Sequence, residues 1–69
     1  MKYPCYYELD GDIYVKLFKE NGKVRAINHY GLPYPSFHAV LNGSPITREE
    51  YLKGVLERNK IENPNVKPD

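Results

Sequence analysis

The residues with the most versatile chemistry in this chain are one cysteine and two histidines. Cys5 is the single cysteine among 69 residues, and His29 and His38 are nine positions apart. These three side chains could ligate a metal, but their spacing matches no zinc pattern and a closed site needs a fourth ligand. A cysteine–histidine nucleophile pair needs a proximity in space that this spacing does not impose. We therefore predict a non-enzymatic protein without catalytic residues, metal or cofactor.

Two carboxylates flank a glycine in the stretch Asp10-Gly11-Asp12. A calcium loop would need further oxygen ligands and a distal glutamate, and the stretch does not continue in that way. Aspartate and glycine are also typical turn residues, because both tolerate the backbone angles that turns require. The stretch therefore predicts a turn between two strands rather than a cation site.

Aromatic and basic side chains alternate along the segments on either side of an Asn-Gly dipeptide. In a two-stranded hairpin they would share one face: Tyr14, Lys16, Phe18, Arg25, Ile27 and His29. Such a face can anchor a protein partner, because tyrosine and arginine are enriched in interface hot spots. It can also stack the bases and hold the phosphates of single-stranded nucleic acid. Two plainer alternatives are simple cross-strand pairing and coverage of the face by residues 34–41.

A proline-rich segment, residues 31–35, follows this hairpin. Its two prolines favour extended backbone and exclude a regular ladder. The segment could be a stiff crossover that Tyr34 and Phe37 pin to the core, or it could present Tyr34 to a partner at little entropic cost. The two interpretations are compatible. The predicted partner-binding residues are therefore Tyr14, Lys16, Phe18, Arg25, His29 and Tyr34.

Three strands must position these side chains, and the alternation of apolar and polar residues predicts them at residues 3–9, 13–20 and 23–30. The Asn-Gly dipeptide favours a two-residue type I′ turn, which places Leu17 opposite Ala26. A three-residue first turn would place Leu9 opposite Ile13 and align the apolar residues of the first two strands. The apolar face would then contain Cys5, Tyr7, Leu9, Ile13, Val15, Leu17 and Ala26.

The C-terminal part predicts one helix. Thr47 followed by Glu50 is a capping box, which marks a helix start, and the helix should end near Lys60. Residues 37–41 could form a short fourth strand, and residues 42–45 a turn. The apolar stripe of the helix has helical spacing and contains Tyr51, Leu52, Val55 and Leu56. We expect this stripe to cover the sheet face that carries Val15, Leu17 and Ala26.

The predicted fold class is α+β: a small antiparallel β-meander of three or four strands with one C-terminal helix packed on one face. A small open β-barrel that sets the helix aside is the structural alternative. We expect one domain over residues 1–61, because 69 residues support a single small core. Residues 62–69 contain two prolines and two asparagines and are expected to form a disordered tail.

Composition narrows the expected partners and location. The formal net charge is +1, which gives no strong field to attract nucleic acid. The N-terminal residues contain no long apolar run, and no stretch approaches the roughly 20 apolar residues of a membrane span. A single cysteine rules out an internal disulfide and fits a reducing compartment. We therefore expect a cytoplasmic protein that does not contact membranes.

The functional prediction combines the missing catalytic groups with an abundance of tyrosines, seven in all. We expect a small protein-binding module that acts as an adaptor, inhibitor or regulator through the aromatic and basic face. Single-stranded nucleic-acid binding through the same face is the alternative, and nine acidic residues against ten basic ones weaken it. A homodimer formed through a strand edge or this face is a further option. An origin in a phage or another mobile element would suit so small a chain.

Overall fold

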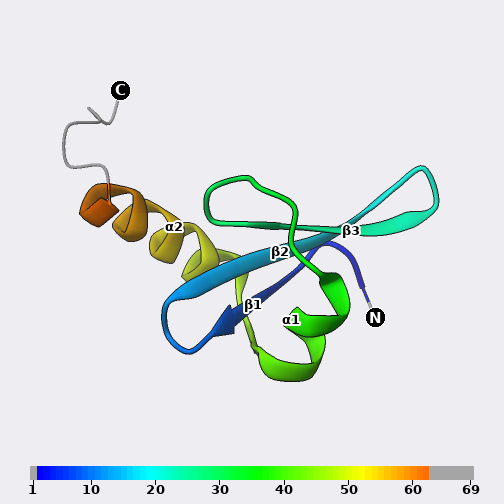
Figure 1. Ribbon diagram of the computed structural model, residues 1–69, viewed down its shortest axis with the longest axis horizontal. Helices are drawn as coiled ribbons and strands as arrows, with labels where there is room; N and C mark the ends of the chain where they lie inside the picture. Colours follow the sequence, from blue (N-terminus) through cyan, green and yellow to red (C-terminus); the bar gives the residue numbers. More distant parts are fainter. Residues whose placement is uncertain (1, 63–69) are drawn as a thin grey trace.

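Four strands and two helices make up the computed structural model, which describes residues 2–62 (Figure 1). The strands are β1 (Cys5–Leu9), β2 (Ile13–Glu20), β3 (Lys23–Asn28) and β4 (Ser44–Ile46). The helices are α1 (Ser36–Asn42) and α2 (Arg48–Glu62). The strand order is β3-β2-β1-β4, and all neighbours are antiparallel. The predicted α+β class is confirmed, with an open sheet rather than a barrel and with two helices rather than one.

The β2–β3 hairpin has the register predicted from its Asn-Gly turn. Leu17 lies opposite Ala26. Asn21 and Gly22 have positive φ angles of 53° and 77°, as the type I′ turn requires at both positions. The third strand ends at Asn28, two residues earlier than the alternation predicted.

The first two strands are joined by the predicted three-residue turn. Leu9 lies opposite Ile13, and the amide of Asp12 donates a hydrogen bond to the carbonyl of Leu9 at 3.0 Å. Asp10 and Gly11 both adopt left-handed backbone, with φ angles of 55° and 66°. The two carboxylates at residues 10 and 12 therefore belong to a tight turn, as the sequence predicted.

The core lies on the sheet face that was predicted to be apolar. It is a cluster of buried residues, namely Tyr7, Leu9, Val15, Leu17, Ala26 and Ala39. The strand residues in this cluster occupy alternate positions, which point to the same side of a pleated sheet. Ala39 comes from α1, and its small side chain is completely buried. Helix α1 is therefore the helix that covers this face.

The segment after the hairpin differs from its prediction in two places. Residues 37–41 form most of helix α1 and not a strand. A short apolar run cannot distinguish a buried strand from one helical turn, and the tertiary position decided between them. Residues 44 and 45, predicted in a turn, begin strand β4, in which Ile46 pairs with Tyr6. Pro45 is tolerated because β4 is an edge strand that needs no amide donor there.

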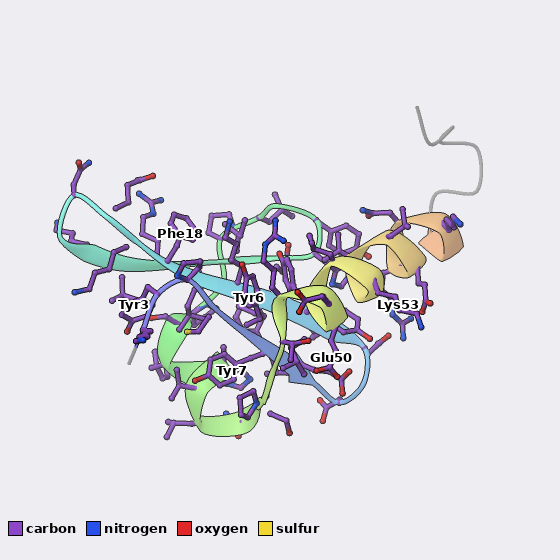
Figure 2. The ribbon with its side chains drawn as sticks, turned by 180° about the vertical axis from the view of Figure 1, so that it is seen from behind. Tyr3, Tyr6, Tyr7, Phe18, Glu50 and Lys53 are labelled. Atoms are coloured by element: carbon purple, nitrogen blue, oxygen red, sulfur yellow. The ribbon has the colours of Figure 1, made fainter. Side chains whose placement is uncertain are left out.

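Helix α2 begins with the predicted capping box but packs on the opposite side of the sheet. The amide of Thr47 donates to Oε1 of Glu50, and the amide of Glu50 donates to Oγ1 of Thr47, both at 3.1 Å. The ring of Tyr51 lies 4.8 Å from the ring of Tyr6, centroid to centroid. Tyr6 points away from the core face, so the two helices cover opposite faces of the sheet (Figure 2).

Two expectations about this helix are therefore wrong. The helix does not cover the face that carries Val15, because α1 already occupies it. Its sheet-facing line contains Tyr51 and Gly54, both buried, whereas Leu52 and Leu56 are 47% and 52% exposed. Because glycine is not apolar enough to mark a buried position, the stripe predicted from the apolar residues lies to one side of the line that faces the sheet. Apart from Glu62, at which α2 ends, the predicted tail lies outside the described residues.

Candidate functional site

One half of the predicted aromatic and basic face is covered by α2. The ring of Tyr14 lies directly beneath Gly54, where a Cβ atom would be only 2.5 Å from two of the ring carbons. Nδ1 of His29 accepts a hydrogen bond from the amide of Tyr14 at 3.4 Å, and the two rings meet edge to face. His29 is buried. Tyr14, which is half-buried, therefore joins the sheet to α2, and His29 packs against it from below the surface.

Charged groups surround the half of the face that contains Tyr14. Burial raises the pKa of Tyr14 above its ordinary value, and the carboxylate of Glu8, which accepts a hydrogen bond from the Tyr14 hydroxyl, raises this pKa further. The guanidinium of Arg58 lies 2.8 Å from a carboxylate oxygen of Asp12 and donates to the carbonyl of Gly11 at 3.0 Å. Arg58 thereby ties α2 to the β1–β2 turn, and the acidic turn serves as its anchor.

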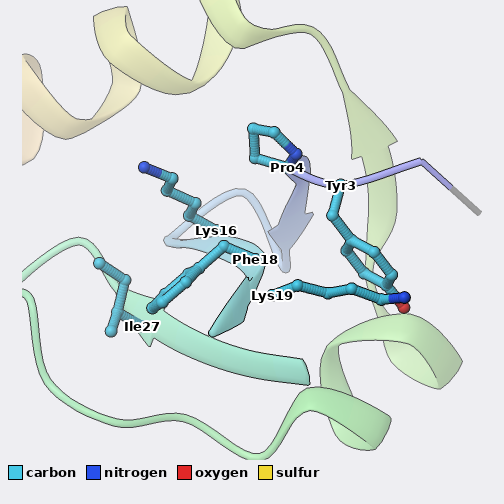
Figure 3. A pocket seen from close by; sticks show the side chains of 6 residues that line it. All are labelled: Tyr3, Pro4, Lys16, Phe18, Lys19 and Ile27. Carbon is cyan, nitrogen blue, oxygen red and sulfur yellow. The ribbon is translucent and has the colours of Figure 1, made fainter. Parts of the chain in front are cut away.

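The other half of the face is open and hollowed (Figure 3). We call this recess the aromatic hollow. It has a volume of about 480 Å³ and is lined by Tyr3, Pro4, Lys16, Phe18, Lys19 and Ile27. The ammonium group of Lys16 lies 5.8 Å from the centre of the Phe18 ring, and that of Lys19 lies 5.7 Å from the Tyr3 ring. Of the predicted site residues, Lys16 and Phe18 meet here. Tyr3 and Lys19 were missed by the sequence analysis.

The two remaining predicted site residues lie outside this hollow. Arg25 forms an exposed ion pair with Glu20 at 3.2 Å near the hairpin tip, and exposed pairs of this kind contribute little to stability. Tyr34 is partly buried against the core, and its amide donates to the carbonyl of Ala26 at 3.0 Å. Residues 31–35 thus run back along the edge of β3 as a crossover. Phe37 does not pin this crossover to the core, because it is 70% exposed.

A second hollow of about 480 Å³ lies on the α1 side of the sheet, and we call it the apolar groove. Its lining contains two hydroxyl-bearing residues and no charged group: Tyr3, Leu17, Val24, Ser36, Phe37, Val40 and Leu41. The sequence analysis missed it because residues 37–41 were taken for a strand. Phe37, Val40 and Leu41 are spaced by three and four positions, which is the spacing of one helix face and could have indicated it.

The side chains with metal or nucleophile chemistry are Cys5, His29 and His38. Residues 2–62 contain no group of three or more histidine, cysteine or acidic side chains arranged to hold a metal ion. His38 lies beside Tyr34 and shares a 3.2 Å contact with the side-chain amide of Asn42. Burial raises the pKa of the Cys5 thiol, which keeps it protonated and weakly nucleophilic.

Neither helix in residues 2–62 combines the length and the apolar character needed to cross a membrane. Comparisons with protein-family models, with curated proteins and with solved structures found no match to this chain. The two hollows adjoin at Tyr3, which lines both of them.

Proposed function

We propose that this protein is a small non-enzymatic binding module for another protein, and that the apolar groove is its main contact surface. The observation that supports this proposal is the outward position of the large side chains of α1. Phe37 and Leu41 are 70% and 76% exposed, whereas the residue that α1 places in the core is Ala39. Small proteins seldom leave apolar side chains clustered beside a groove unless another molecule covers them.

The energetics favour a partner for this groove. Burying a side chain of the size of phenylalanine or leucine contributes about 1.5–3 kcal/mol relative to leaving it in water. Phe37, Val40 and Leu41 of α1 line the groove together with Val24 and Leu17 of the sheet. A partner that covers the groove would gain most of this burial. The groove would then hold the hot spot of the interface, and the polar hairpin would form its rim.

Single-stranded nucleic-acid binding is the second candidate, and the aromatic hollow favours it. Two rings, Tyr3 and Phe18, lie there beside two lysines, and such pairs suit stacked bases with neighbouring phosphates. This function would leave the exposed residues of α1 without a role. We therefore rank protein binding first, acting in an adaptor, inhibitor or regulator, and we propose a reducing cytoplasmic setting because Cys5 has no internal disulfide partner.

The proposal is tested by partner capture followed by reconstitution. The immobilised protein is exposed to a nuclease-treated lysate of its own source, captured proteins are identified by mass spectrometry, and each is purified and titrated by calorimetry. We expect at least one purified protein to bind with a defined stoichiometry. The double variant Phe37→Ser with Leu41→Ser should abolish this binding while keeping the wild-type circular dichroism spectrum, because both side chains are exposed.

A matched control comes from the other helix. Leu52→Ser with Leu56→Ser removes two leucines of α2 that are also about half exposed, and it should bind the partner like the wild type. Loss of binding in both double variants would point to a general loss of apolar surface rather than to the groove. Material that is captured only without nuclease and only at low salt would support nucleic-acid binding instead.

A further inference from the structure

The charges of this protein are unevenly distributed although the net charge is +1. The N-terminal residues and the hairpin, residues 2–4 and 16–27, carry five cations and one carboxylate. The β1–β2 turn region and the first three turns of α2, residues 8–12 and 48–58, carry six carboxylates and three cations. Figure 1 shows the hairpin tip and α2 at opposite ends of the long axis. The molecule therefore has a basic end and an acidic end.

The apolar groove opens at the basic end. Lys19 lies over Tyr3 and pairs across the sheet with Val24, and both of these residues line the groove. Residues 36–46, which include α1, contain no lysine, arginine, aspartate or glutamate. The nearest carboxylate in the hairpin, Glu20, is already paired with Arg25. The cation at the border of the groove is therefore Lys19, and the neighbouring carboxylate of Glu20 is already engaged by Arg25.

Two lysines at this end, Lys16 in the aromatic hollow and Lys19 beside the groove, have no carboxylate partner among residues 2–62. Each rests beside an aromatic ring. A cation that is partly covered by a ring keeps its charge and is less well hydrated, so an incoming carboxylate is attracted at a smaller desolvation cost. The surface thus combines an apolar recess with positive charge along its border.

We infer that the apolar groove binds an acidic amphipathic segment of a partner protein, an inference that rests on the proposed protein-binding function. The apolar side chains of the segment fill the groove between α1 and the hairpin. Its carboxylates lie against Lys19 at the border of the groove and against Lys2, which adjoins Tyr3 in the sequence. Charge complementarity selects this partner over a basic or neutral segment, because a basic segment would meet the like charge of Lys19 and Lys2.

The test uses a displayed library of short random peptides selected on the immobilised wild-type protein. Enriched peptides are synthesised with a fluorescent label and titrated by anisotropy at low and high salt. We expect them to carry a net negative charge and apolar residues three or four positions apart. Amide chemical-shift changes in the labelled protein should concentrate in α1 and the hairpin, and binding should weaken at high salt.

Charge-reversal variants distinguish the contribution of the lysines to peptide binding from that of the apolar groove residues. Lys19→Glu with Lys2→Glu should lower the affinity for the acidic peptides about fivefold or more at low salt. Each exposed ion pair that is lost removes a modest Coulomb attraction. The control Lys53→Glu changes an exposed lysine of α2 and should leave affinity unchanged. Phe37→Ser with Leu41→Ser should abolish peptide binding at every salt concentration.

Each other outcome overturns a defined part of the reasoning. Enrichment of neutral or basic peptides that map to the same groove refutes the acidic partner and leaves the protein-binding function standing. No enrichment of any peptide, with the protein shown to be folded, counts against both. Tight binding of oligothymidylate that displaces the peptides makes nucleic acid the ligand. Self-association that buries the groove, detected by sedimentation, makes a second copy of this chain its occupant.

Discussion

Replacement of Gly54 by alanine reverses the usual effect of removing a glycine from a helix. In an exposed helix interior, this change stabilises by about 1 kcal/mol, because alanine has the higher helix propensity. Here the added Cβ would lie 2.5 Å from two ring carbons of Tyr14 and 2.9 Å from a third. Carbon atoms do not approach this closely without repulsion, so either the ring or the helix must move.

The magnitude follows from the two opposing terms. Forcing one additional carbon into a packed site costs about 1–3 kcal/mol, and we take the upper half of this range because the Tyr14 hydroxyl is bonded to Glu8 and its ring packs edge to face on His29. After subtraction of the propensity gain, we expect Gly54→Ala to destabilise the protein by about 1–2 kcal/mol. For a domain of this size that lowers Tm by roughly 5–15 °C.

The assay is thermal and urea unfolding followed by circular dichroism, in a double-mutant cycle with Tyr14→Val. Valine keeps a good strand former at residue 14 and removes the ring. In this background Gly54→Ala should stabilise by about 1 kcal/mol, because only the propensity term remains. The change of sign between the two backgrounds is the diagnostic result. If Gly54→Ala stabilises the protein that retains Tyr14, then α2 does not pack on this face and the described contact is incorrect.

Two further predictions concern the core and the effect of alkali. Val15→Asp should unfold the protein because Val15 is fully buried, whereas Leu56→Asp should change stability by no more than about 0.5 kcal/mol because Leu56 is half exposed; urea unfolding distinguishes them, and equal losses would place Leu56 in the core. Burial raises the pKa of three tyrosines above the ordinary value of 10.0, namely Tyr7, Tyr14 and Tyr51. Because the folded-state pKa values exceed the unfolded ones, this contribution to stability is complete below pH 10 and is lost as the pH rises through the folded-state values. Tyrosinate absorbance and circular dichroism should therefore change together above that pH, and early ionisation of all tyrosines in a folded protein would contradict their burial.

The local elements of this protein were determined by short stretches of sequence. The Asn-Gly dipeptide determined the hairpin and its register, because positive φ at two consecutive residues leaves few other turns. Thr47 and Glu50 determined the start of α2 through two reciprocal hydrogen bonds. Each of these features depends on residues close together in the chain. The α+β class followed from such features and needed no knowledge of the packing.

The candidate site could be predicted only in part, for a reason that lies in the chemistry of tyrosine. Lys16 and Phe18 were correctly placed on one face, since alternation along a strand fixes that relation. Tyr14 satisfied the same pattern yet lies beneath α2. A tyrosine has an apolar ring and a polar hydroxyl, so it suits a buried or an exposed position equally well, and its place in the pattern does not reveal which one it occupies.

Only the tertiary structure decided which helix covers which face of the sheet. Both faces carry enough ring and aliphatic surface to receive a helix, so the apolar pattern of the strands did not distinguish them. The choice depended on two small residues: Ala39 lets α1 approach Val15 and Leu17, and Gly54 lets α2 sit on the ring of Tyr14. Small residues give almost no hydrophobic signal in a sequence. They act by allowing close approach, and that effect exists only once the partner surface is in place.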